Sequence, residues 1–212
     1  MTVLVQGREL TFPIVIRKAR SWAAQYRVDK TRAQALVPAP LQATGLVSLA
    51  FVQYEEGDLD AYNEFGLTLM VKDLKTGKLA SYIHRLPVSE PFTCEAGRTI
   101  WGYPKWVTDV AIEGATCRVE DQVELTVGRG WFPMPLPAVP TYSACDGVLR
   151  RTEWDVDTKG LRARLGGARL TLGTGELAHE LRSLGLPKRA LMTTTIPSFK
   201  VSFGPAETVA TD

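Results

Sequence analysis

The chain has 212 residues, of which 45% are hydrophobic and 23% charged, and its formal net charge is +2. These proportions are ordinary for a globular protein, and the length fits a single domain, 1–212, that can bury a substantial core. The 25 Lys and Arg residues are scattered without a dense basic run, so we expect no nucleic-acid partner.

The first ten residues lack a basic start followed by an apolar stretch, so no secretory signal is expected. No apolar run approaches the roughly 20 residues needed to span a bilayer, and no membrane partner is expected. The cysteines, Cys94, Cys117 and Cys145, have neither the paired spacing of a zinc site nor the density of a disulfide scaffold. We therefore expect free thiols, no metal site and a cytoplasmic protein.

Short β-type segments dominate the first two thirds of the sequence. Residues 10–16 and 46–54 are of this type, and residues 66–74 alternate between apolar and polar side chains. Further strands are expected over 107–112, 117–119 and 123–127. Because strand follows strand without long helices between them, antiparallel pairing is favoured.

Two stretches predict helices. Residues 29–36 begin with a plausible N-cap, Asp29, and stop before a proline. Residues 174–184 are followed by Gly185, a typical helix C-terminal residue. One face of this second helix carries three leucines, Leu177, Leu181 and Leu184.

Residues 131–140 contain four prolines, which exclude a central strand and indicate an extended surface loop, either a plain connector or a flap over a site. Together these patterns predict a mainly β (α+β) fold, drawn as an antiparallel closed β-barrel with a few short flanking helices.

One segment stands out chemically: Gly97-Arg98-Thr99-Ile100-Trp101-Gly102-Tyr103-Pro104-Lys105-Trp106. It holds one lysine, Lys105, among glycines and aromatic residues. Pro104 fixes the backbone just before this lysine, and Gly102 permits a bend that a strand does not make.

The rings of Trp101, Tyr103 and Trp106 are expected to wall in the amine of Lys105. A lysine shielded in this way loses hydration, which disfavours its ammonium form. A neutral lysine amine attacks a ketone to form a Schiff base, and the protonated imine then draws electrons from the neighbouring carbon. The alternative, a solvated turn residue, is the commonest role of a lysine that follows a proline.

This segment resembles the signature of acetoacetate decarboxylases, in which a Gly-Arg pair precedes an aromatic-Pro-Lys that carries the reactive amine. Two further stretches resemble the family: Val37-Pro38-Ala39-Pro40-Leu41 early in the chain and Leu184-Gly185-Leu186-Pro187 near its end. The similarity therefore runs along most of the chain, and its specific part is the lysine segment.

The resemblance implies a role for each matching residue. Lys105 is similar to the Schiff-base lysine, and Glu64 falls where the family places a pocket carboxylate that orients substrate or moves protons; a solvated loop carboxylate is the alternative. Arg98 is expected either to contact substrate or to brace the loop through an ion pair. For His84, a structural residue with its hydrogen bonds made is favoured over a catalytic base. Substrate contacts are expected from these two and from Tyr103, Trp101, Trp106 and Arg20.

Three departures from the family pattern stand out. Family members follow the reactive lysine with a second lysine, whose charge helps to keep the first one neutral, and here that neighbour is Trp106. A second pocket carboxylate is replaced by Ala50. The substrate-facing arginine of the family has no clean counterpart, although Arg20 or Lys18 can serve.

The sequence leaves three functions open. The first is decarboxylation of a small β-keto acid through an iminium on Lys105, and the second is aldolase-dehydratase chemistry on a larger keto acid with the same lysine. The third is a non-catalytic barrel that binds an apolar small molecule. The resemblance further implies a small carbonyl substrate, a homo-oligomer and no cofactor, since a lysine imine needs none.

Overall fold

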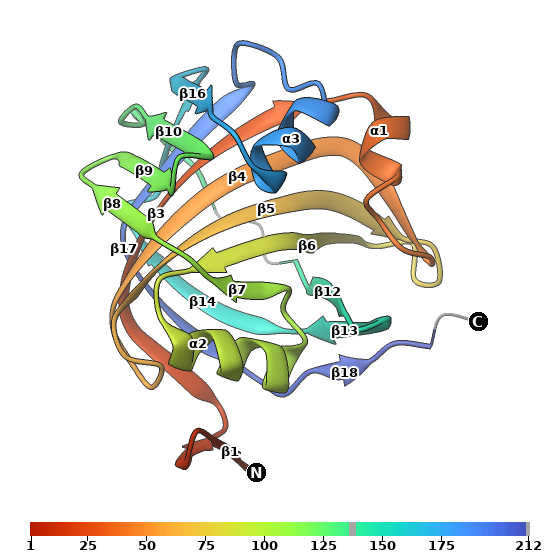
Figure 1. The fold of residues 1–212 in the computed structure, drawn as a ribbon, viewed down its shortest axis with the longest axis vertical. Helices are drawn as coiled ribbons and strands as arrows, with labels where there is room; N and C mark the ends of the chain where they lie inside the picture. Colours follow the sequence, from red (N-terminus) through yellow and green to blue (C-terminus); the bar gives the residue numbers. More distant parts are fainter. Residues whose placement is uncertain (136–138, 211–212) are drawn as a thin grey trace.

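The computed structural model describes residues 1–135 and 139–210. Most of these residues form strands, which belong to three sheets (Figure 1). The largest sheet has twelve strands. They are β3 (Ile14–Arg27), β4 (Leu41–Gly57), β5 (Tyr62–Asp73), β6 (Leu79–Val88), β7 (Lys105–Val107), β11 (Phe132–Pro133), β12 (Thr141–Cys145), β13 (Val148–Thr152), β14 (Trp154–Lys159), β15 (Arg162–Leu165), β17 (Met192–Phe203) and β18 (Glu207–Thr208).

This sheet is open, so the predicted closed barrel is wrong. The strands follow the order β11-β15-β17-β3-β4-β5-β6-β12-β13-β18, with β14 beside β17 and β7 beside β6, and within the described residues no ladder joins β11 to β18. The long strands bend strongly instead, so that the sheet curves around its contents (Figure 1). Side chains alternate identically in a curved open sheet and in a barrel, so the sequence pattern did not distinguish the two.

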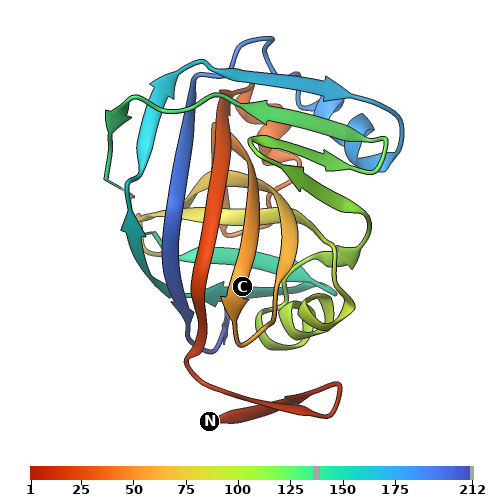
Figure 2. The same ribbon diagram turned by 90° about the vertical axis from the view of Figure 1, so that its left-hand side faces the viewer.

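Two smaller sheets complete the β structure. A four-stranded sheet has the order β16-β10-β9-β8. A separate hairpin at the N-terminus lies at one end of the molecule, where its Val5 and Leu10 are buried (Figure 2). The strands concerned are β8 (Val110–Glu113), β9 (Thr116–Val119), β10 (Val123–Val127), β16 (Ala168–Leu172), β1 (Thr2–Val5) and β2 (Arg8–Thr11).

Four short helical elements are described: α1 (Lys30–Gln34), α2 (Pro91–Ala96), the π-helical turn η1 (Gly97–Trp101) and α3 (Glu176–Ser183). In Figure 1, α1 and α3 lie near one end of the long strands and α2 lies near β7. None of the helices in the described part of the chain combines the length and the apolar character required to cross a lipid bilayer.

Both predicted helices are present but shorter than expected, over Lys30–Gln34 and Glu176–Ser183. Asp29 Oδ1 accepts hydrogen bonds from the backbone N–H groups of Thr31 and Arg32, at 2.9 and 3.1 Å, which caps α1 as expected. Helix α3 buries Leu177 and Leu181. Among residues 131–135 and 139–140 of the proline-rich segment, the two-residue edge strand β11 is the only strand, and residues 136–138, with Pro137, lie outside the described residues.

The long strands carry apolar side chains on both faces and separate two cores. One core gathers residues such as Phe51, Phe65 and Leu181 with the four-stranded sheet and α3. The other contains Tyr54 and Trp101 together with apolar residues of β17. The lysine segment belongs to this second core.

Candidate active site

The backbone places Lys105 by an irregular passage from helix to strand. Helix α2 continues into the π-helical turn η1, which ends at Gly102 with φ 64°, a left-handed conformation that favours glycine. The Tyr103 N–H donates to the carbonyl of Gly97 at 3.0 Å, which folds the chain back. Strand β7 then begins at Lys105, which pairs in parallel with Leu86 of β6. The left-handed turn at Gly102 therefore reverses the chain just before Lys105, whose side chain is directed inward.

The amine of Lys105 is enclosed. The residue is 3% exposed, and Nζ lies 2.8 Å from Glu64 Oε2. Nζ also donates to Thr93 Oγ1 at 3.2 Å and lies 5.0 Å from the centroid of the Tyr62 ring. Of the lysines and arginines in the described chain, Lys105 is the only one that is buried. Glu64 lies at hydrogen-bond distance from this amine and is therefore placed to exchange a proton with it.

Tyrosines surround the pair. The Tyr54 hydroxyl donates to Glu64 Oε1 at 3.0 Å, and the rings of Tyr54 and Tyr62 stack with centroids 4.2 Å apart. Burial, followed by the charge of Glu64, raises the pKa of both phenols well above its usual value. The same two causes raise the pKa of Tyr103. All three hydroxyls therefore remain uncharged donors at neutral pH.

The ladder between β4 and β5 explains why these groups meet. Tyr54 pairs with Tyr62, and Glu64 occupies the next position on the same face, opposite Val52. Alternation along a strand places Ala50 on this face as well. Sequence reasoning missed Tyr54, Tyr62 and Thr93. The i, i+2 spacing of Tyr62 and Glu64 was the available signal for Tyr62, and nothing in the sequence marked Tyr54 or Thr93.

Arg98 lies outside this enclosure. Its side chain is 46% exposed, its Nη1 donates to the backbone carbonyl of Lys105 at 3.1 Å, and its Nη2 is 3.9 Å from Asp146. These contacts connect Arg98 to the loop that carries the lysine.

The three aromatic residues of the segment occupy different environments. Trp101 is buried, stacks on Tyr103 with ring centroids 5.5 Å apart, and donates from Nε1 to the carbonyl of Gly204 at 2.8 Å. Trp106 follows Lys105 directly in strand β7, so its side chain points to the opposite face. The expected wall therefore does not include Trp106; the ring beside the amine is that of Tyr62.

Two residues that were expected to contact the substrate, Arg20 and His84, have polar partners other than Lys105. Arg20 is 45% exposed and pairs with Glu55, as does Lys18. His84 Nε2 lies 2.7 Å from Oε1 of Glu180 on α3, which packs on the first core. This contact gives His84 a polar partner on α3.

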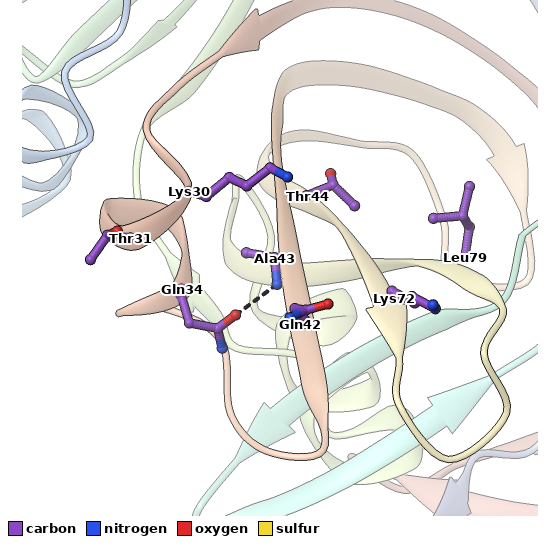
Figure 3. Close-up of a pocket in the computed structure, with 8 residues that line it drawn as sticks. All are labelled: Lys30, Thr31, Gln34, Gln42, Ala43, Thr44, Lys72 and Leu79. Atoms are coloured by element: carbon purple, nitrogen blue, oxygen red, sulfur yellow. Dashed lines mark hydrogen bonds between the residues drawn. The ribbon is translucent and has the colours of Figure 1, made fainter.

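A hollow of about 510 Å³ lies elsewhere, between α1 and the far ends of β4 and β5 (Figure 3). Its lining contains the lysines Lys30 and Lys72, and Gln34 Oε1 accepts a hydrogen bond from the N–H of Ala43 at 2.8 Å. No carboxylate belongs to this lining, so nothing there is placed to activate an amine as Glu64 does for Lys105. In the described residues, no group of three or more His, Cys, Asp or Glu side chains is arranged to hold a metal ion.

Comparison with known families decides the classification. The family model described as acetoacetate decarboxylase matches residues 6–131, which is more than half of the chain. The chain belongs to the acetoacetate decarboxylase family. The resemblance carried by the lysine segment is thereby confirmed, and the protein is an enzyme of this family, so the non-catalytic barrel is set aside. A comparison with curated proteins gives no match.

Solved structures support the same fold. The acetoacetate decarboxylase from Legionella pneumophila superposes with a TM-score of 0.76 at 19% identity, covering 96% of this chain and 91% of that one. The enduracididine biosynthesis enzyme MppR, complexed with pyruvate, gives 0.73 at 18% identity, with 95% and 92% coverage. An acetoacetate decarboxylase-like enzyme from Sphingomonas wittichii RW1 gives 0.72 at 16% identity, with 96% and 95% coverage. At these identities the similarity concerns the fold.

Proposed function

We propose that this protein is a Schiff-base lyase in which Lys105 forms an imine with a small carbonyl compound and Glu64 moves the protons. The observation that carries the proposal is the 2.8 Å contact between Lys105 Nζ and Glu64 Oε2 inside an enclosure that leaves the lysine 3% exposed. A lysine with a carboxylate at hydrogen-bond distance satisfies the geometric condition for a nucleophile and its base.

The chemistry follows from these two groups. Glu64 accepts a proton from the ammonium of Lys105, and the free amine adds to the carbonyl carbon. The same carboxyl group then returns a proton to the departing oxygen, which leaves as water. The resulting iminium withdraws electrons while a bond to the α carbon breaks. The hydroxyl of Tyr54 holds Glu64 Oε1, so Oε2 stays directed at the amine.

The surroundings favour a small substrate. Lys105 and Glu64 are 3% and 7% exposed, so a substrate reaches them only when neighbouring side chains move aside. MppR structures contain pyruvate and the condensation product of pyruvate and imidazole 4-carboxaldehyde, which supports a carbonyl substrate here. A homo-oligomeric, cytoplasmic enzyme that uses no cofactor is part of this proposal.

Reductive trapping tests the proposal. The protein is incubated with acetone and with small aldehydes, treated with borohydride, and digested for mass spectrometry. We expect one adduct, on Lys105, that disappears in Lys105→Gln. Lys72→Gln is the matched control, because Lys72 is an exposed lysine in the hollow of Figure 3, and it should keep the adduct. Adducts spread evenly over surface lysines, with none on Lys105, would refute imine chemistry at this site.

A further inference from the structure

We propose that the substrate of this site carries no carboxylate beside its reacting carbonyl, and that it is a neutral β-hydroxy ketone cleaved by a retro-aldol step. This inference rests on the proposed Schiff-base function and specifies its substrate class. The observation behind it is the balance of buried charge around Lys105.

The buried charges cancel before any substrate enters. Lys105 is the only buried lysine or arginine of the described chain, and Glu64 is the carboxylate that faces it at 2.8 Å. Imine formation keeps a single positive charge at the nitrogen of Lys105, so a neutral substrate leaves the site balanced. A keto acid would add a second negative charge close to Glu64. A carboxylate buried without a cation or a full set of hydrogen bonds is strongly disfavoured.

The candidate cations are directed elsewhere. Arg20 is paired with Glu55 at the surface. Arg98 donates a hydrogen bond from one guanidinium nitrogen to the backbone carbonyl of Lys105. The guanidinium of Arg150 packs against Gly102. Burial raises the pKa of the Cys145 thiol at the end of β12, and the positive charges of Arg98 and Arg150 partly oppose that rise. On the face of Glu64, β4 contributes Val52 directly opposite and Ala50 at the next position on that face, and neither brings a charge.

Neutral donors are available instead. Burial raises the pKa of Tyr62 and of Tyr103, with a further rise from Glu64, so both hydroxyls stay protonated. Phenol hydroxyls donate well to a ketone or alcohol oxygen and bring no charge to compensate. A β-hydroxy ketone offers one such oxygen at each end of the bond that breaks.

The step balances with the groups present. The amine of Lys105 adds to the ketone and water leaves, giving the iminium. Glu64 takes the proton of the β-hydroxyl, and the bond between the α and β carbons breaks. Its electron pair moves to the iminium to give an enamine, and a free carbonyl compound departs. The enamine takes the proton back at its α carbon, and water then releases the second carbonyl compound from Lys105. No external oxidant or reductant is consumed.

The test compares acids with their neutral amides. Acetoacetate is set against acetoacetamide and pyruvate against pyruvamide, with borohydride trapping on the intact protein and Nα-acetyllysine as the reference for intrinsic reactivity. Any adduct on Lys105 counts, including acetone formed from acetoacetate. Each rate is divided by the rate of the same compound with Nα-acetyllysine. We then expect the amide in each pair to be trapped about 100-fold faster than the acid, because the acid would bury an unpaired negative charge. We also expect diacetone alcohol to be cleaved to acetone by the native protein and not by Lys105→Gln.

Each outcome has a distinct meaning. Equal or faster trapping of the acids overturns the neutral-substrate inference and leaves the Schiff-base function intact. Absence of any Lys105 adduct overturns both. Ala50→Arg adds a cation on the face of Glu64, and Ala50→Gln is its neutral control of similar length. We expect Ala50→Arg, unlike Ala50→Gln, to raise the ratio of the acid trapping rate to the amide trapping rate at least about tenfold. Equal ratios in the two variants would contradict the charge argument. If either variant fails to fold, the ratio measured on the native protein decides alone.

Discussion

Gly97 gives Lys105 the room in which its side chain lies. A Cβ built on Gly97 would fall 2.6 Å from Cδ and 2.7 Å from Cε of Lys105, closer than side-chain carbons approach. Gly97 has φ −62°, an ordinary helical value, so its backbone alone does not require glycine. The glycine of the Gly-Arg pair is therefore needed for the space it leaves beside the reactive amine.

Gly97→Ala should displace the amine from Glu64 while the fold persists, because the flexible lysine stem yields before the backbone does. Misplacing a reacting group by about 1 Å can cost on the order of 100-fold in rate, and we expect a loss of that size in the trapping rate of acetone on Lys105. Gly204→Ala is the control, because a Cβ there would meet its nearest atom at 4.0 Å. An unchanged trapping rate in Gly97→Ala, with both variants folded by circular dichroism, would contradict this steric role.

Tyr54→Phe should slow imine formation through Glu64. The lost hydroxyl donates to Glu64 Oε1 at 3.0 Å, and a hydrogen bond to a buried carboxylate is worth about 1.5–3 kcal/mol. We expect a rate loss of about tenfold or more and a shifted pH profile of trapping. Tyr142→Phe is the matched control, since it removes a similar bond to the buried carboxylate of Asp73, 2.9 Å long, outside the site. Equal effects of the two variants on trapping would show that Tyr54 only stabilises the fold.

Local features could be predicted from the sequence because their causes are local. The cap at Asp29 and the buried leucines of α3 depend on residues a few positions apart. Lys105 and Glu64 were named through the family resemblance, and their mutual distance came only from the structure. What depends on long-range pairing could not be predicted, including the open edges of the sheet and the partner of His84, Glu180, which lies 96 residues further along the chain.

The errors at the site have similar causes. The strand expected over 107–112 begins in fact at Lys105 and breaks before Val110, and this shift turns Trp106 away from the amine. Tyr54 joins Glu64 only through the register of two strands, which sequence spacing does not fix.

Breaking the buried ion pair from one side should destabilise the protein more than replacing both partners. Glu64→Leu leaves the Lys105 charge buried without its partner, and such losses cost about 3–5 kcal/mol. The double variant Glu64→Leu with Lys105→Met removes both charges, and we expect it to recover much of that loss. Urea denaturation of the native protein, both single variants and the double variant measures the coupling. A double variant whose destabilisation equals the sum of the single ones would show that the pair contributes no coupling to the fold.

Acid should weaken the contact between β6 and α3. Burial acts to raise the pKa of Glu180, but hydrogen bonds from His84 and Arg85 outweigh it and lower that pKa from 4.5 to about 2. Because the folded protein holds this carboxylate ionised more firmly than the unfolded chain does, its contribution is fully present above pH 4.5 and is lost as the pH falls through 2. We expect Glu180→Gln to lower the free energy of unfolding by about 2 kcal/mol at neutral pH and to remove part of the pH dependence in that window. Glu176→Gln is the control, because the side chain of Glu176 is 81% exposed, and it should retain the native profile. A Glu180→Gln profile that runs parallel to the native one between those two pH values would show that this carboxylate does not link stability to pH.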